Sequence, residues 1–348
     1  MGCTRFSLGT MRKGERNLIT DVPGVTVGQK AIDKGDVHTG VTAILPHQGN
    51  LFKEKLVASC HVLNGFGKSA GLMQVEELGT IETPIILSNT FAVGTASNAI
   101  ISYSLEKNPD IGRETGTVNP LAFECNDGYL SDIRAMAVTE EDVRMAIDSA
   151  SASFKEGAAG GGRGMMCYGL KGGIGSSSRI VAIGNKEYTL GALLMTNFGS
   201  MEDLVIAGDP IGRKLTKHPP FEDKGSVITI LATNAPLSSR QLGRICHRVQ
   251  SGIARTGSFM GSGSGEVVLA FSTATHIPHY EAESVTSLPM LAEKEMNKLF
   301  KATVEAVEES VVSSLEHAQT LVGRNGNTAR SLSEMLPFRT IDNSSLSK

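Results

Sequence analysis

The sequence predicts a mixed α/β or α+β protein, and three observations support this class. Short runs rich in β-branched and apolar residues alternate with amphipathic helical patterns along the chain. Glycine is abundant, with 39 of 348 residues, and it gathers between the apolar runs, where tight turns favour a residue without a Cβ. No linker rich in Pro or Ser divides the chain, so we expect a single structural domain over residues 1–348.

Six short runs are expected to form strands, because apolar and β-branched residues dominate them and turn residues bound them. Runs of this length are typical of strands that are buried in a sheet. The six runs are residues 41–45, 83–87, 180–183, 190–196, 227–232 and 267–272.

Three segments carry the spacing of apolar residues that predicts amphipathic helices. Residues 140–155 begin with acidic side chains, which favour the first turn of a helix. Residues 239–253 show a similar apolar stripe, and residues 290–317 form a long amphipathic pattern. After about residue 337 the chain is polar and has no periodicity, so we expect a loosely held terminus.

Charge and composition argue against nucleic-acid and membrane partners. Thirty-three basic and 36 acidic residues leave a formal charge of −3, without long runs of one sign. There is no Trp, and aromatic residues make up 5 %, so platforms for base stacking are not expected. No apolar window reaches the length of a membrane span, and the first residues lack the apolar core of a signal peptide. We expect a cytoplasmic protein whose partner is a small molecule or another copy of the chain.

Motifs for metals and cofactors are incomplete. The five cysteines are widely spaced and form no CxxC pair, which predicts reduced thiols rather than a zinc site or a disulfide framework. Residues 65–69 (GFGKS) lack the earlier glycine of a phosphate-binding loop, since Val62 occupies that position. His276 and His279 lie three residues apart with a proline between them, and no third ligand is near in sequence. We therefore expect neither a metal nor an organic cofactor.

The peptide bond between Gly225 and Ser226 can undergo a reaction that the other motifs do not offer. A polar stretch ends there, and the apolar run from Val227 starts at once. A serine hydroxyl can attack the carbonyl that precedes it when the backbone is suitably held, and glycine leaves that carbonyl accessible. Cleavage would release an α-amine with a pKa of about 7.7–8.0, which can act as a base for the same hydroxyl. The alternative is an ordinary turn before a strand, which such a step more commonly forms.

Several motifs, in a fixed order, resemble one family of enzymes. The segment GSVITILATNAPLSSRQLG from Gly225 and the segment GSGSGEVVLAFST from Gly261 are similar to the P1 family of peptidases. That family includes the L-aminopeptidase/D-amidase/D-esterase enzymes and the β-peptidyl aminopeptidases. The resemblance runs from about residue 15 to residue 335, and Asn325 stands where the family often has Asp. Further matching motifs lie at residues 19–28, 63–65 with Gly71, 84–90, 124–128, 171–179, 196–199 and 323–326.

The resemblance implies an architecture and a maturation step. The fold would be a four-layer αββα sandwich of the N-terminal nucleophile (Ntn) hydrolase type. The chain would cut itself between Gly225 and Ser226 into an α chain of residues 1–225 and a β chain of residues 226–348. The cleaved αβ heterodimers would assemble into a homotetramer.

Residue roles follow from the same resemblance. Ser226 matches the nucleophile, and Asn197 matches the amide donor of the oxyanion hole, where one hydrogen bond lowers a barrier by about 2.7–4 kcal/mol. Ser264 and Glu266 match a polar pair beside the nucleophile, and their alternation predicts that they share one face of a strand. Glu124 matches an acidic residue that holds the free amine of the substrate.

The implied function is that of a self-processing serine aminopeptidase or amidase. It would release N-terminal amino acids from small peptides, amides or esters through an acyl-enzyme on Ser226. An aromatic residue of some relatives is replaced here by Asn126 or displaced to Tyr129, which makes Tyr129 a candidate for substrate binding. Two alternatives remain: acyl transfer of the ornithine acetyltransferase type, which uses Thr at the cut, and an uncleaved, non-catalytic binding protein.

Overall fold

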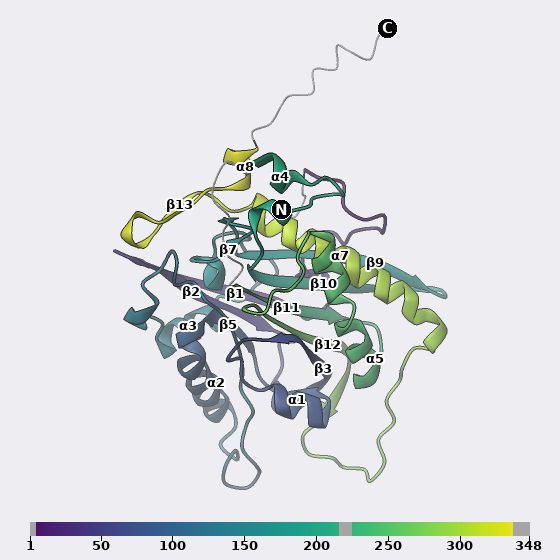
Figure 1. Cartoon of the computed structure of the whole chain (residues 1–348). Coiled ribbons are helices and arrows are strands. Elements are labelled where there is room, and N and C mark those ends of the chain that lie inside the picture. Colours follow the sequence, from purple (N-terminus) through teal and green to yellow (C-terminus); the bar gives the residue numbers. More distant parts are fainter. Residues whose placement is uncertain (1–4, 216–224, 337–348) are drawn as a thin grey trace.

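Two β-sheets face each other at the centre of the molecule (Figure 1). The structure, a computed structural model, describes residues 5–215 and 225–336. One sheet has the strand order β1 (Thr26–Lys34), β2 (Val37–Leu45), β5 (Ile85–Asn89) and β6 (Leu121–Cys125). The other has the order β4 (Thr80–Ile81), β3 (Glu54–Gly65), β12 (Gly265–Pro278), β11 (Ser226–Thr233), β10 (Lys186–Asn197) and β9 (Ile174–Ile183).

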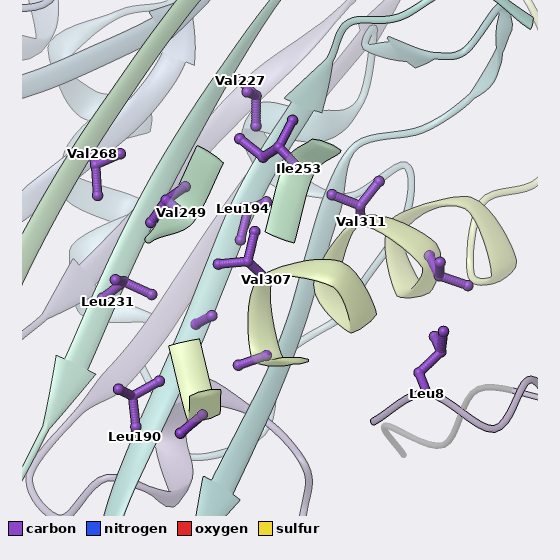
Figure 2. Packing of buried hydrophobic residues seen from close by; sticks show 14 of the residues in the cluster. Leu8, Leu190, Leu194, Val227, Leu231, Val249, Ile253, Val268, Val307 and Val311 are labelled. Carbon is purple, nitrogen blue, oxygen red and sulfur yellow. The ribbon is translucent and has the colours of Figure 1, made fainter. Parts of the chain in front are cut away.

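Helices cover the outer face of each sheet and complete four layers. Buried residues of β2, β5 and β6 pack against α2 (Val93–Lys107) and α3 (Glu140–Asp148). A second buried cluster fills the space between the two sheets. A third joins the six-stranded sheet to α5 (Ser239–Cys246), α6 (Val249–Arg255) and α7 (Met296–Glu316), and Figure 2 shows β10, β11 and β12 meeting α6 and α7. The layers therefore follow the order helix, sheet, sheet, helix, which confirms the predicted αββα sandwich.

The remaining helices and strands are short. They are α1 (Leu72–Leu78), α4 (Ile211–Leu215), α8 (Leu332–Met335), β7 (Met166–Cys167), β8 (Leu170–Lys171), β13 (Leu321–Val322) and β14 (Thr328–Ala329). β7 pairs with β8, and β13 pairs with β14. Within the described ranges no helix combines the length and the apolar character needed to cross a membrane. The polar terminus expected after residue 337 lies outside the described residues.

All six predicted strands are present, and the structure adds others that the sequence pattern did not indicate. The six runs lie in or overlap β2, β5, β9, β10, β11 and β12. β1, β3, β6 and α2 were not predicted. β1 escapes the pattern because it forms an edge of its sheet, so that its second half is largely exposed and carries Lys and Asp side chains.

The helix predicted over residues 140–155 has the correct start, but the observed helix is shorter. Thr139 caps its first turn by accepting a hydrogen bond from the backbone N–H of Asp142, with the Asp142 side chain bonding back. The helix then ends at Asp148, because Ser151 leaves it to pair with Val27 at the edge of β1. Two backbone hydrogen bonds, of 3.0 and 3.1 Å, join Ser151 to Val27. Tertiary pairing therefore overrides the helical periodicity of the last residues.

The other two predicted helices differ from the structure in smaller ways. The helix expected over residues 239–253 is interrupted between α5 and α6. At the interruption the backbone N–H of Arg248 bonds to the carbonyl of Ile245, three residues back, which tightens the turn. The helix expected over residues 290–317 begins later, at Met296, and otherwise follows the prediction.

The register of three central strands determines where the site forms. β11 starts at Ser226 and pairs with both of its neighbours from that first residue. Ser226 lies opposite Asn197, the last residue of the antiparallel strand β10. On its other side it lies opposite Gly265, the first residue of the parallel strand β12. The end of β10 and the beginnings of β11 and β12 therefore lie side by side at one edge of the sheet.

Candidate active site

A pocket of about 290 Å³ opens at this edge. Its walls come from the loop that follows β6, from the glycine-rich segment around β7, and from the residues on either side of the β10–β11 junction. Side chains of mostly apolar character line it, with two Asn amides among them. The lining residues are Asn126, Gly128, Tyr129, Ile133, Met166, Gly169, Asn197, Phe198, Gly199 and Gly225.

Gly225 occupies a space that only glycine fits. A Cβ at this position would lie 1.7 Å from the carbonyl oxygen of Asn197. The Gly225 carbonyl oxygen accepts a hydrogen bond of 3.2 Å from the backbone N–H of Gly265. Ser226 is buried, and its Oγ lies 3.2 Å from the position that a Cβ on Gly265 would take. The peptide between Gly225 and Ser226 is therefore closely held, and a donor polarises its carbonyl group.

The side-chain amide of Asn197 has a defined orientation. Its Oδ1 accepts a hydrogen bond of 2.9 Å from the backbone N–H of Met166. Its Nδ2 donates one hydrogen bond of 3.0 Å to the carbonyl oxygen of Asn126. Because an amide nitrogen has two N–H groups, a second donor remains on the side chain that lines the pocket. The geometry suits stabilisation of negative charge on a bound oxygen.

Ser264 and Glu266 form a buried polar pair on either side of Gly265. The Ser264 hydroxyl donates a hydrogen bond to the Glu266 carboxylate, so the two side chains share one side of the strand, as their alternation predicted. The Nδ2 of Asn64 donates to the carbonyl oxygens of Gly261 (2.8 Å) and Ser264 (2.6 Å), which fixes the turn before β12. Gly265 lies opposite Ser226, the candidate nucleophile, in the neighbouring strand. Ser264 and Glu266, on either side of Gly265, therefore lie next to Ser226 in the sheet.

The two substrate-binding candidates have different positions. Tyr129 is 43 % exposed and forms part of the pocket wall. Glu124 is buried on β6 and, among the described residues, does not belong to that wall. One of its carboxylate oxygens accepts the backbone N–H of Lys68 at 2.9 Å, and the other accepts the Thr90 hydroxyl. A carboxylate has more lone pairs than these two donors use, so Glu124 keeps the capacity to bind an ammonium group.

A buried lysine, the first residue of the matching motif at residues 171–179, supports one wall of the pocket, although the sequence suggested no role for it. The Nζ of Lys171 donates hydrogen bonds to the carbonyl oxygens of Gly162 (3.1 Å), Met165 (2.6 Å) and Gly172 (2.7 Å). Its side chain is completely buried, and this burial lowers the pKa of Lys171 to about 7. The dense glycines over residues 157–175 indicated close packing of backbone, but nothing in them indicated a buried cation.

A buried carboxyl group, Asp127, lies in the loop that follows β6. Asp127 is 1 % exposed, and burial raises the pKa of its carboxyl group to about 7. The side chains of Thr39 and Asn89 face the group and partly oppose this shift. Neither carboxylate oxygen, however, receives a hydrogen bond of good geometry from the described part of the chain. Asp127 is therefore a buried carboxyl group in the loop between Asn126 and Gly128, which both line the pocket.

One cluster of possible metal ligands lies elsewhere. Ligand atoms of His47, Glu54 and His276 lie within 4.8 Å of one another in the described residues. Both ring nitrogens of His47 already have backbone partners, the carbonyl of Glu54 at 2.7 Å and the N–H of Gly49 at 3.0 Å. His279, which the sequence placed beside His276, instead bonds to a threonine hydroxyl and packs on a phenylalanine ring. The cluster as it stands does not present three available ligands.

Comparison with known proteins gives consistent results. A family model described as peptidase family S58 matches residues 17–329. The β-peptidyl aminopeptidase BapA of Sphingosinicella microcystinivorans is 34 % identical over 347 residues, covering 92 % of this chain and 86 % of that protein.

Solved structures agree over almost the whole chain. The PH0078 protein of Pyrococcus horikoshii OT3 is 50 % identical with a TM-score of 0.91, and 94 % of each chain is covered. The L-aminopeptidase D-Ala-esterase/amidase of Ochrobactrum anthropi is 34 % identical with a TM-score of 0.89, again with 94 % of each chain covered. It is described as a prototype for the serine aminopeptidases and a variant of the Ntn-hydrolase fold.

Fold and relatives together define the class of this protein. It is a serine aminopeptidase or amidase with an Ntn-hydrolase type of αββα sandwich. The αββα layers and the pocket at the start of β11 agree with that class. The chain belongs to peptidase family S58.

Proposed function

We propose that the chain cuts itself between Gly225 and Ser226 and that Ser226 then serves as the catalytic nucleophile. The observation that carries the proposal is the position of Gly225, which lines the pocket and whose carbonyl oxygen accepts the N–H of Gly265. In the cut, the Ser226 hydroxyl oxygen attacks the Gly225 carbonyl carbon, the C–N bond breaks, and the hydroxyl proton ends on the amine. Water then hydrolyses the resulting ester and leaves a carboxylate on Gly225 and a free α-amine on Ser226.

Turnover of a small peptide, amino-acyl amide or ester follows the same chemistry. The Ser226 hydroxyl attacks the acyl carbon of the N-terminal residue while its own α-amine takes the proton. The remaining N–H of Asn197 stabilises the oxyanion, and Ser264 with Glu266 orients the groups around the nucleophile. Glu124 holds the free amine of the substrate, which selects N-terminal residues. The amine product leaves, and water releases the amino acid from the acyl-enzyme without a cofactor.

The two pieces, residues 1–225 and 226–348, stay together as one structural domain in this proposal. Eight positions of β11 pair with β10 across the cut, and α7 packs on β9 and β10. We further expect the cleaved αβ heterodimers to form a homotetramer, which light scattering after size-exclusion chromatography measures directly.

Intact mass under denaturing conditions tests the cut. The 36.8 kDa wild type should yield fragments of about 24 and 13 kDa, and Ser226→Ala should remain whole. A whole wild-type chain without activity on amino-acyl p-nitroanilides would instead favour a non-catalytic binding protein. Acyl transfer would appear in a product assay as the acyl group on an added amine acceptor rather than as free amino acid.

A further inference from the structure

The wall of the pocket depends on a hairpin far along the chain. We infer that the C-terminal hairpin, formed by β13, the turn Arg324–Gly326 and β14, holds the pocket wall loop of residues 126–130 in place. In this role Arg324 and Asn327 are positioning residues that set the preference for the acyl side chain. The inference rests on the proposed function, which it deepens by assigning an element to substrate selection.

Three successive carbonyl groups of the wall loop accept hydrogen bonds from the hairpin. The Nε of Arg324 donates to the Gly128 carbonyl oxygen at 2.9 Å. The Nδ2 of Asn327 donates to the Tyr129 carbonyl oxygen at 2.8 Å. The backbone N–H of Arg324 donates to the Leu130 carbonyl oxygen at 2.9 Å. Peptide planes whose carbonyls are all engaged cannot turn without breaking a bond, so the loop is fixed in one shape.

The hairpin is itself rigid and fits closely against the loop. A Cβ on Gly323 would lie 2.1 Å from the Leu130 carbonyl oxygen, so only glycine allows this approach. The turn has Asn325 in the left-handed region with φ 54°, which asparagine tolerates better than most residues. Backbone bonds from Gly323 to Asn327 and from Asn327 to Arg324 close the turn. The donors are therefore presented from a preorganised support.

Apolar packing adds a second connection to the pocket. Leu321 and Ala329 of the hairpin form a buried cluster with Leu130 and Met166. Met166 lines the pocket, and its backbone N–H orients the Asn197 side chain. The hairpin thus supports both the wall loop and the segment around Met166, which orients the Asn197 side chain, the candidate oxyanion donor.

The hairpin and the wall loop lie on opposite sides of the proposed cut. The loop belongs to residues 1–225 and the hairpin to residues 226–348, so both pieces shape one pocket. Tyr129, Ile133, Met166 and Phe198 make the wall mainly apolar, and its volume of about 290 Å³ exceeds the roughly 150 Å³ that holds a benzene ring. The substrate class that fits is a peptide or amide whose N-terminal residue has a branched or aromatic apolar side chain.

Kinetics on two substrates test the inference with the full-length, self-processed enzyme. For leucyl p-nitroanilide, Arg324→Ala and Asn327→Ala should each lower kcat/KM about five- to tenfold, mainly through KM. For alanyl p-nitroanilide, which fills less of the pocket, the change should stay below about threefold. Arg324→Lys keeps a cationic donor and should restore part of the loss. The matched control is Arg330→Ala, whose exposed side chain pairs with Glu334 in the described part of the chain and should leave both substrates unaffected.

Hydrogen exchange provides a readout that does not need activity. The N–H groups of Leu130 and Ser131 bond to the carbonyl oxygen of Asp127 at 3.1 and 3.0 Å, so their protection reports the shape of the loop. Exchange in the peptide containing them should accelerate in Arg324→Ala and not in Arg330→Ala. Unchanged exchange together with an unchanged ratio of kcat/KM for leucyl and alanyl p-nitroanilide would overturn the inference. Equal losses of kcat on both substrates would overturn it as well. A wild type that hydrolyses neither substrate would instead refute the proposed function.

Discussion

The backbone N–H of Gly265 donates a hydrogen bond to the carbonyl oxygen of Gly225, across the parallel pair of β11 and β12. This bond would stabilise the negative charge that develops on the oxygen when the Ser226 hydroxyl attacks. A Cβ on Gly265 would lie 2.4 Å from the backbone carbonyl oxygen of Phe66, which forces the strand to shift. The donor and the carbonyl would then separate.

Gly265→Ala is therefore expected to slow self-cleavage at least tenfold. The remaining uncut precursor can be followed by intact mass over time after expression or refolding. Gly94→Ala serves as the control, because a Cβ at Gly94 meets no atom within 4 Å. Cleavage of Gly265→Ala at the wild-type rate, in a protein with wild-type circular dichroism, would rule out this role for the hydrogen bond.

Asn197→Asp separates the two functions of the side-chain amide. The carboxylate can still accept the N–H of Met166, but it has no N–H to offer a developing oxyanion and also loses the hydrogen bond to the Asn126 carbonyl oxygen. We expect kcat of the processed fraction to fall about 10²–10³-fold with little change in KM, since the donor acts in the transition state. The exposed Asn185→Asp is the control for introduced charge. A loss expressed only in KM would mean that Asn197 binds substrate rather than stabilising the oxyanion.

Arg179 links the two sides of the proposed cut through buried ion pairs. It lies fully buried on β9 and bonds to Glu309 at 2.6 Å and Glu305 at 3.3 Å, both on α7. Removing one partner of such a group leaves buried charges without compensation, which costs about 3–5 kcal/mol. We expect Arg179→Ala to lower the free energy of unfolding by that amount when measured with urea in the uncleaved Ser226→Ala background.

A surface ion pair gives the matched control for that measurement. Arg12 pairs with Glu187 on the surface, where both side chains are more than half exposed. Arg12→Ala should change the free energy of unfolding by only about 0–1 kcal/mol. Equal effects of the two arginine variants would show that the buried network contributes no more than a surface pair.

Patterns of neighbouring residues predicted two features of this site, a strand and a shared face. The apolar run after Ser226 predicted β11, and the alternation of Ser264 and Glu266 predicted a shared face, which their hydrogen bond confirms. Periodicity failed where distant pairing decides the outcome, as at Ser151, which leaves its predicted helix for β1. The roles of the catalytic candidates came from family resemblance, and they remain predictions.

The supports of the pocket were beyond sequence reasoning for a physical reason. Arg324 and Asn327 act on carbonyl groups of residues 128–130, and backbone carbonyls have no sequence signature. In the described residues the Lys171 ammonium group likewise bonds to three backbone oxygens. The motifs at residues 171–179 and 323–326 include Lys171 and Arg324, but a side chain that bonds to backbone atoms carries no residue pattern that reveals its partner.

The buried Asp127 should make stability depend on pH in a defined direction. Its pKa is raised from 3.8 to about 7, so between these values the folded chain binds more protons than the unfolded chain. Stability contributed by the protonated group is therefore lost as pH rises from about 4 to 7. Lys171 acts in a different window, because its lowered pKa makes the unfolded chain bind more protons only above about pH 7.

Asp127→Asn replaces the carboxyl group with an amide of the same shape that does not titrate. From pH 5 to pH 7 the free energy of unfolding of the variant should rise by about 2–3 kcal/mol relative to that of wild type. Each pH unit in this window corresponds to about 1.4 kcal/mol. Urea unfolding of both proteins at the two pH values, in the Ser226→Ala background, measures the difference. For the control Asp36→Asn, at an exposed turn, the free energy of unfolding should change with pH in parallel with that of wild type. Parallel curves for Asp127→Asn as well would mean that Asp127 is already ionised at pH 5 and that the protein tolerates its buried charge.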